Sequence, residues 1–147
     1  MTDDPGQPVI LVSDRQTMPV DEPGLVALAR ETLRAEGHSR AELSLSFVED
    51  EEMAGLHVRF MDEPGPTDVL SFPMDDDDRE HDDVRVLGDV VIAPAVAARN
   101  NPGDPSAELR LLLVHGILHL LGYDHETQDE RAEMWSRQER LSGVRTP

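Results

Sequence analysis

The chain contains no cysteine, which excludes disulfide bonds and thiolate metal ligands. It also has no apolar run near the roughly 18 residues that a membrane-spanning helix needs, so no membrane segment is expected. Its first residues, 1–6, are acidic, whereas a secretory signal places a basic region before an apolar one. The lack of cysteine leaves the redox compartment undetermined, whereas the lack of a membrane segment and of a secretory signal predicts a soluble, cytoplasmic protein.

Lysine is absent as well. All 13 basic residues are arginine, and against 31 acidic residues they leave a formal net charge of −18. Nucleic-acid affinity comes largely from neutralised phosphates, and a strongly acidic chain repels a polyanion at long range. A broad RNA-binding face is therefore not expected, and we interpret the acidity as a general surface property that favours solubility.

Three histidines, His115, His119 and His125, follow one another at i, i+4 and i+10. Four residues of α-helix turn the chain by about 400°, so the first two lie one turn apart on nearly the same face. His125 reaches the same ion only if the chain turns back, and Gly122 permits that turn because glycine adopts the left-handed conformation at little cost. The spacing predicts a site for one zinc ion or another divalent transition metal.

Three protein ligands leave a fourth position open, which is the arrangement of catalytic zinc sites. Two other interpretations remain open: a closed structural site with Asp124 or a distant carboxylate as fourth ligand, and a buried helix whose third histidine lies on the surface. His38, His57 and His81 lack a partner pattern and are expected to be surface or capping residues. The acidic run 75–83 lacks the oxygen spacing and central glycine of a calcium loop, so a solvated loop is expected.

Zinc proteases with the motif H-E-x-x-H-x-x-G-x-x-H share this histidine spacing, but Gly116 stands where their glutamate would be. That glutamate takes a proton from zinc-bound water and passes it to the leaving amine. A zinc peptidase lacking its usual glutamate is therefore the second interpretation. On this basis casein-like substrates should stay uncut, and Gly116→Glu should be the only route toward peptidase activity.

The apolar pattern predicts an α+β fold in one domain, residues 1–147: a small mixed β-sheet of about four strands packed with helices around a central buried helix that carries the metal ligands. Strands are predicted at 9–12, which should be buried, and at 43–48, 68–72 and 84–92. Helices are predicted from Pro23 to before Gly37, and at 49–60, shortly after 94, at 105–121 and at 128–141.

Local signals define two of these helices. Asp104 followed by Pro105 should cap the helix 105–121, and Thr127 with Glu130 should form a capping box on the last helix. Apolar residues surround nearly the whole circumference of the helix 105–121, so it should lie centrally.

The histidine motif, the block 65–73 (Gly-Pro-Thr-Asp-Val-Leu-Ser-Phe-Pro) and the block 87–92 (Leu-Gly-Asp-Val-Val-Ile) together resemble the YbeY family of bacterial rRNA-maturation factors. The blocks occur in the family's order, and the resemblance covers about residues 40–140. It implies a single-strand-specific, metal-dependent endoribonuclease in ribosomal RNA maturation (16S rRNA 3′ end processing) and 30S subunit quality control. It further implies His115, His119 and His125 as zinc ligands, and ribosomal RNA with the small ribosomal subunit or a ribosomal protein as partners.

The family often carries an arginine a few residues before the P-T-D-V-L-S-F block, proposed to face RNA, where this sequence has Met61. Arg59 is the candidate to replace it as a substrate-binding residue. No general base is assigned: metal-bound hydroxide, Asp68 and the RNA itself remain open. Thr67, Asp68 and Ser71 could build the sheet or reach a cleft. A non-catalytic ribosome-assembly factor with a structural zinc remains a third interpretation.

Overall fold

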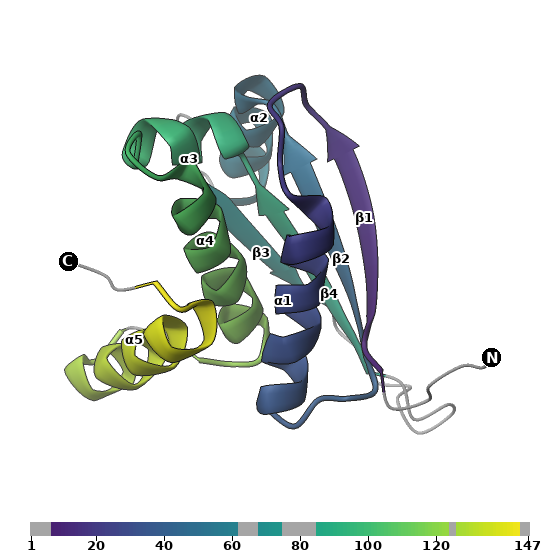
Figure 1. Cartoon of the computed structure of the whole chain (residues 1–147), viewed down its shortest axis with the longest axis vertical. Coiled ribbons are helices and arrows are strands. Elements are labelled where there is room, and N and C mark those ends of the chain that lie inside the picture. The colour runs from purple at the N-terminus through teal and green to yellow at the C-terminus, as the bar shows by residue number, and fades with distance from the viewer. Residues whose placement is uncertain (1–6, 62–67, 75–84, 124–125, 145–147) are drawn as a thin grey trace.

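The computed structural model describes residues 7–61, 68–74, 85–123 and 126–144 of the 147-residue chain (Figure 1). Within these ranges it contains four strands and five helices, which confirms the predicted α+β class. In chain order they are β1 (Val9–Arg15), α1 (Glu22–Ala35), β2 (Ala41–Val48), α2 (Asp50–Met61), β3 (Val69–Pro73), β4 (Arg85–Ile92), α3 (Pro94–Asn100), α4 (Pro105–Leu120) and α5 (Gln128–Ser142).

The strands form one mixed sheet in the order β1-β2-β4-β3. β1, β2 and β4 run parallel, whereas β3 is antiparallel to β4. Parallel neighbours need a crossover connection, and α1 supplies it between β1 and β2. β2 and β4 are also parallel, and the chain between them passes through α2 and β3. Because the two crossovers differ, they leave no regular repeat in the sequence.

Helices cover the two faces of the sheet unequally. α1 and α4 lie on one face, where alternate residues of β2 (Leu43, Leu45 and Phe47) join the main core with side chains of both helices. Neighbouring strand residues point to opposite faces, so Val48 and Val91 join a second core beneath α2 on the other face. Figure 1 shows α2 behind the sheet and α1 and α4 in front of it.

The prediction that residues 9–12 form a buried strand is wrong. β1 is an edge strand, and the side chains of Val9 and Leu11 leave these residues 45% and 50% exposed. Only Ile10 and Val12 pack against the core. A short apolar run resembles a central strand in sequence, but the outer face of β1 meets α2 at Arg15, which pairs with Glu52, and Val9 and Leu11 stay exposed.

The predictions for the central helix are confirmed. Asp104 caps α4, its carboxylate accepting a hydrogen bond from the Ala107 amide at 3.1 Å. Nine residues of α4 are buried, between the sheet, α1, α3 and α5. The capping box of Thr127 and Glu130 is also present at the start of α5. No helix in the described part of the chain is long and apolar enough to cross a bilayer, and the acidic run 75–83 lies outside the described residues.

Candidate active site

α4 brings His115 and His119 together near its C-terminal end. Their ring centroids lie 5.8 Å apart, with the ring planes at 59°. His115 is half-buried against α5, and His119 is exposed. The adjacency expected from the i, i+4 spacing is therefore confirmed.

Gln138 of α5 fixes the His115 ring. The Nδ1 atom of His115 lies 2.7 Å from the Gln138 side-chain oxygen Oε1, and Gln138 is only 3% exposed. The edge of Trp135 also contacts this ring, with centroids 6.0 Å apart and planes at 86°. A carboxamide oxygen only accepts hydrogen bonds, so Nδ1 is the donor in this contact and Nε2 is the ring nitrogen that would bind a metal.

The turn after α4 fixes the His119 ring in the same way. Gly122 has φ +105°, and the amides of Gly122 and Tyr123 donate to the carbonyls of His119 and Leu118. This closes a Schellman motif, as the glycine predicts. The reversed chain places the Tyr123 carbonyl 3.0 Å from Nδ1 of His119. A carbonyl only accepts, so Nδ1 of His119 is the donor in this contact and Nε2 is the ring nitrogen that would bind a metal.

The donor chemistry of this pair fits zinc. Metal-binding histidines generally donate one ring N–H to a carbonyl or carboxylate while the other nitrogen binds the ion, and both histidines show that arrangement. His125 and Asp124 lie outside the described residues, so the third ligand remains a prediction. Within the described ranges alone, no three His, Cys, Asp or Glu side chains are grouped to hold a metal ion.

Gln138 offers the first test of this arrangement. Gln138→Leu keeps a side chain of similar size but removes the acceptor for His115, and we expect zinc affinity to fall about 10- to 100-fold. Competition with a chromophoric chelator would measure it. Gln128→Leu, at the exposed start of the same helix, is the matched control. Equal affinities for both variants and the wild type would exclude an orienting role for Gln138.

Gly116 faces the sheet. A Cβ atom there would lie 2.8 Å from Cγ1 of Val90 and 3.3 Å from Oγ of Ser71. Ser71 donates a hydrogen bond to the Gly116 carbonyl at 3.1 Å, so this residue of the P-T-D-V-L-S-F block fastens α4 to β3. There is no room for a glutamate at position 116, and Gly116→Glu therefore offers no route to a peptidase base.

Asp68 lies at the other end of α4. Its carboxylate accepts from the Asn100 side chain at 3.1 Å, and its carbonyl accepts from the Ala93 amide. Burial, and then the charge of Asp68, raise the pKa of Glu108 in the first turn of α4. Glu108 precedes His115 by seven residues, about 10 Å along the helix. The structure therefore does not bring Asp68 to the histidines, and Thr67 lies outside the described residues.

Arg59 also lies apart from the histidines. It is exposed in the last turn of α2, with its guanidinium 5.8 Å from the centroid of the Phe60 ring. Phe60 in turn packs edge-on against Phe72 of β3, at 5.2 Å and 70°. This contact is on the face of the sheet opposite α4, because Phe72 and Ser71 are neighbours on one strand. The Met61 side chain lies outside the described part of the structure.

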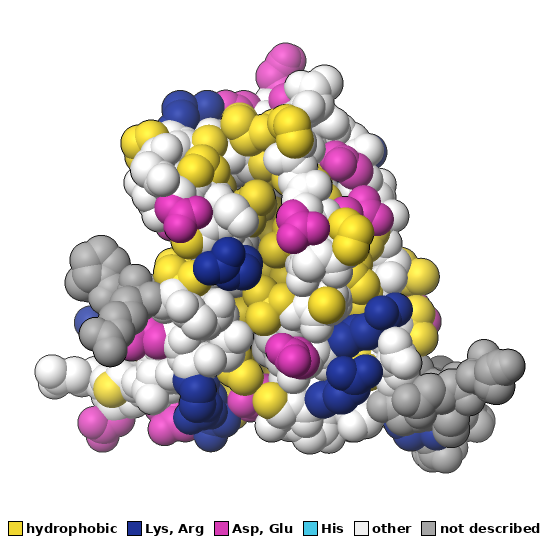
Figure 2. Space-filling view, viewed as in Figure 1, with side chains coloured by type: hydrophobic (Ala, Val, Ile, Leu, Met, Phe, Trp, Pro, Cys, Tyr) yellow, Lys and Arg dark blue, Asp and Glu magenta, His cyan; other side chains and the backbone are white. Residues whose placement is uncertain are grey.

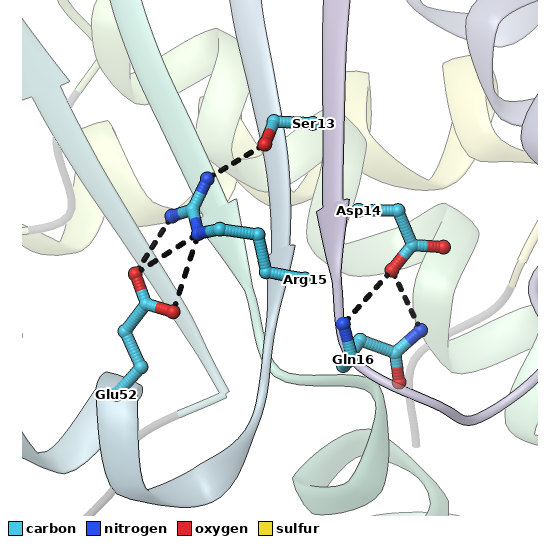
Figure 3. Close-up of polar contacts among 5 residues, drawn as sticks. All are labelled: Ser13, Asp14, Arg15, Gln16 and Glu52. Carbon is cyan, nitrogen blue, oxygen red and sulfur yellow. Dashed lines mark hydrogen bonds and ion pairs between the residues drawn. The ribbon is translucent and has the colours of Figure 1, made fainter.

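A surface pocket of about 480 Å³ lies on the same face of the sheet, beneath α2. Its lining residues are Arg15, Ser46, Glu52, Leu56, Phe60, Phe72, Asp89 and Val91. Arg15 closes one side of it through an ion pair with Glu52 at 2.7 Å and a hydrogen bond to Ser13 (Figure 3). On the opposite face of the molecule, Figure 2 shows arginine and acidic side chains in small separate groups. The described residues form no broad basic surface on that face.

The remaining histidines make no ligand set with the pair on α4 within the described ranges. His38 is half-buried beside Gly122 and Tyr123, where burial and the charge of Arg85 lower its pKa. His57 is half-buried on α2, and His81 lies outside the described residues.

Sequence reasoning missed Gln138, because a glutamine in a polar helix carries no motif of its own. In the structure it is distinguished by its burial and by its contact with His115, 23 residues earlier in the chain.

Comparison with known proteins gives one family. The model of the family described as Endoribonuclease YbeY matches residues 12–143. Proteins named Endoribonuclease YbeY from Beutenbergia cavernae and Thermobifida fusca are each 50% identical over 138 residues, covering 88% of this chain and 92% and 89% of theirs. A solution structure from Thermotoga maritima matches with a TM-score of 0.57 and 25% identity, over 92% of this chain and 90% of that one. The chain therefore belongs to the YbeY family of endoribonucleases, which hydrolyse phosphodiester bonds.

Proposed function

We propose that this chain is a cytoplasmic, single-strand-specific endoribonuclease that uses one zinc ion held by His115, His119 and His125. Its substrate is ribosomal RNA, cleaved during 3′ end maturation of 16S rRNA and 30S subunit quality control. The observation that carries the proposal is the pair of histidines on α4 whose Nδ1 atoms are both held by acceptors. Family membership favours this reaction over a peptidase and over a non-catalytic assembly factor with a structural zinc.

The residues of the chain act mainly by holding the ligands. Nε2 of His115 and Nε2 of His119 are the nitrogens that would bind the ion, while Gln138 and the Tyr123 carbonyl keep the ring protons on Nδ1. When bound, zinc supplies Lewis acidity that lowers the pKa of water and neutralises charge on the phosphoryl oxygens. Gly116 and the distant Asp68 do not provide a carboxylate base beside the pair, so no protein base is assigned.

The direct test is cleavage of labelled RNA containing the 3′ end of 16S rRNA, in single-stranded and duplex form, by zinc-loaded protein. We expect endonucleolytic products from the single strand and little product from the duplex. Purified 30S subunits should be cut more efficiently than naked RNA, because a partner that presents the substrate raises its effective concentration. Equal cleavage of duplex and single strand would contradict the proposed specificity.

The acidic net charge leads to a second prediction, which concerns the affinity for RNA and its salt dependence. A chain of net charge −18 can neutralise only a few phosphates with local arginines, and for single-stranded RNA each contributes about −0.7 to the slope of log affinity against log salt. We expect a slope of about −2 or weaker and poor affinity for naked RNA. Filter binding across a salt series measures it. Tight binding at physiological salt with a slope steeper than about −4 would contradict the hypothesis.

Arg59 is our candidate for one of those contacts. Because it lies across the sheet from α4, RNA would have to pass around the β3 edge to reach both Arg59 and the histidines. Arg59→Ala should slow cleavage and leave zinc binding unchanged. Arg34→Ala, an exposed arginine in the last turn of α1, is the matched control. Equal cleavage by the two variants would remove Arg59 from the substrate path.

A further inference from the structure

A buried carboxylate links three separate parts of the chain next to His119. Glu36, which follows α1 as its C-cap residue, has a side chain only 5% exposed. Its Oε1 atom accepts a hydrogen bond from the Tyr123 hydroxyl at 2.7 Å, and its Oε2 atom accepts one from Nη1 of Arg137 on α5 at 2.9 Å. A buried carboxylate is unfavourable unless it is paired. Here Tyr123 and Arg137 each donate to one oxygen of the Glu36 carboxylate, so the position of its side chain is fixed by both.

Arg137 holds Tyr123 from a second direction. Its guanidinium lies 4.9 Å from the centroid of the Tyr123 ring. Its Nε atom also donates to Glu133 at 2.7 Å, but that carboxylate is 55% exposed, and such surface pairs contribute little. The tyrosine side chain is therefore fixed at its hydroxyl by Glu36 and over its ring by Arg137. A tyrosine has few rotatable bonds, so fixing the ring at both places also restricts its backbone.

That backbone contacts the metal site. The Tyr123 carbonyl is the acceptor that fixes Nδ1 of His119 at 3.0 Å. We propose that Glu36 and Arg137 are positioning residues for the metal centre, and that they act through Tyr123 to hold the His119 ring in its ligand orientation. The inference rests on the proposed zinc function of His119. By this inference Glu36, at the end of α1 and far from the histidine motif in sequence, contributes to the metal site by positioning His119.

Tyr123→Phe tests the link with the least disturbance, because it removes the hydroxyl and keeps both the ring over Arg137 and the carbonyl facing His119. We expect the zinc dissociation constant, measured by chelator competition, to rise about tenfold or more. The visible absorption of the Co(II)-loaded protein should change, because it reports the geometry of the ligands. The melting temperature of the metal-free protein should fall only slightly.

Four further variants separate positioning from simple stabilisation. Glu36→Ala should weaken zinc binding at least as much as Tyr123→Phe, and the double variant should be little weaker than the worse single one, because both changes break one chain of contacts. Glu36→Gln should restore most of the affinity, since its carboxamide oxygen still accepts from the tyrosine. Glu133→Gln breaks the other ion pair of Arg137 and should leave the dissociation constant within about twofold of wild type.

Each outcome decides the inference. Zinc affinity and Co(II) spectra that match the wild type in Tyr123→Phe would overturn it, even if the metal-free protein melted lower, because the network would then be structural only. Equal losses in Glu133→Gln and Tyr123→Phe would overturn the route through Glu36. If Glu36→Ala fails to fold, Tyr123→Phe decides alone. A wild-type protein that binds no zinc would instead refute the proposed metal function, and the inference with it.

Discussion

His119→Ala should lose most of the bound zinc and reduce cleavage of single-stranded RNA by on the order of a thousandfold, because metal catalysis contributes several kcal/mol of charge stabilisation in the transition state. The ring is exposed, and alanine is the best helix former, so α4 should form normally in the variant. The loss would then reflect the missing ligand. Elemental analysis of the purified protein and a gel assay of RNA cleavage measure the two effects.

The melting temperature provides an independent test of the His119→Ala variant. Zinc that binds only the folded wild type stabilises it by about 2.7 kcal/mol at a free concentration one hundred times the dissociation constant. The melting temperature of wild type should therefore rise on adding zinc, and that of His119→Ala should not. His57→Ala, a histidine on α2, serves as the control and should respond as wild type does. Full zinc occupancy in all three single variants, at His115, His119 and His125, would exclude the assignment.

The parts of the fold that were predicted correctly depend on local signals. Asp104 and Pro105 mark the start of α4, its apolar circumference indicates burial, and Gly122 marks the turn that follows it. Each signal lies within a few residues of the structure that it predicts. β1 was misjudged because an apolar run does not reveal how many neighbours a strand will have, and burial of an edge strand is decided by the order of strands in the sheet.

In the candidate site, as in the fold, local geometry made some residues predictable, whereas contacts between distant segments did not. The two histidines on α4 were predictable because helical geometry alone brings positions i and i+4 together. Gln138, Glu36 and Arg137 were not, because they meet the site through contacts between distant segments and belong to no recognisable motif. Arg59 was proposed from its place before a motif, but sequence distance does not show on which face of the sheet α2 packs.

Gly116 and Gly55 should respond with opposite signs to the same substitution. Both lie inside helices, where alanine is favoured over glycine by about 1 kcal/mol. At Gly55 of α2 a Cβ would meet no atom within 4 Å, so Gly55→Ala should raise the free energy of unfolding by about 0.5–1 kcal/mol. At Gly116 a Cβ would lie 2.8 and 3.2 Å from the two methyl groups of the buried residue Val90. Such overpacking costs about 1–3 kcal/mol, and we expect Gly116→Ala to lose about 1–2 kcal/mol net.

Gly116→Glu should be far more damaging, because it adds to the same clash a carboxylate that faces the sheet. Valine has a stiff side chain and cannot turn away to admit it, and a buried charge without a partner is strongly unfavourable. We expect a loss above about 4 kcal/mol, a large share of the 5–15 kcal/mol by which such domains are stable. Urea denaturation would measure all three glycine variants, and a casein assay of any folded Gly116→Glu protein should show no cleavage. A Gly116→Glu protein with wild-type stability would mean that α4 can move away from β4, and the glycine would then not be needed for close packing of the metal helix.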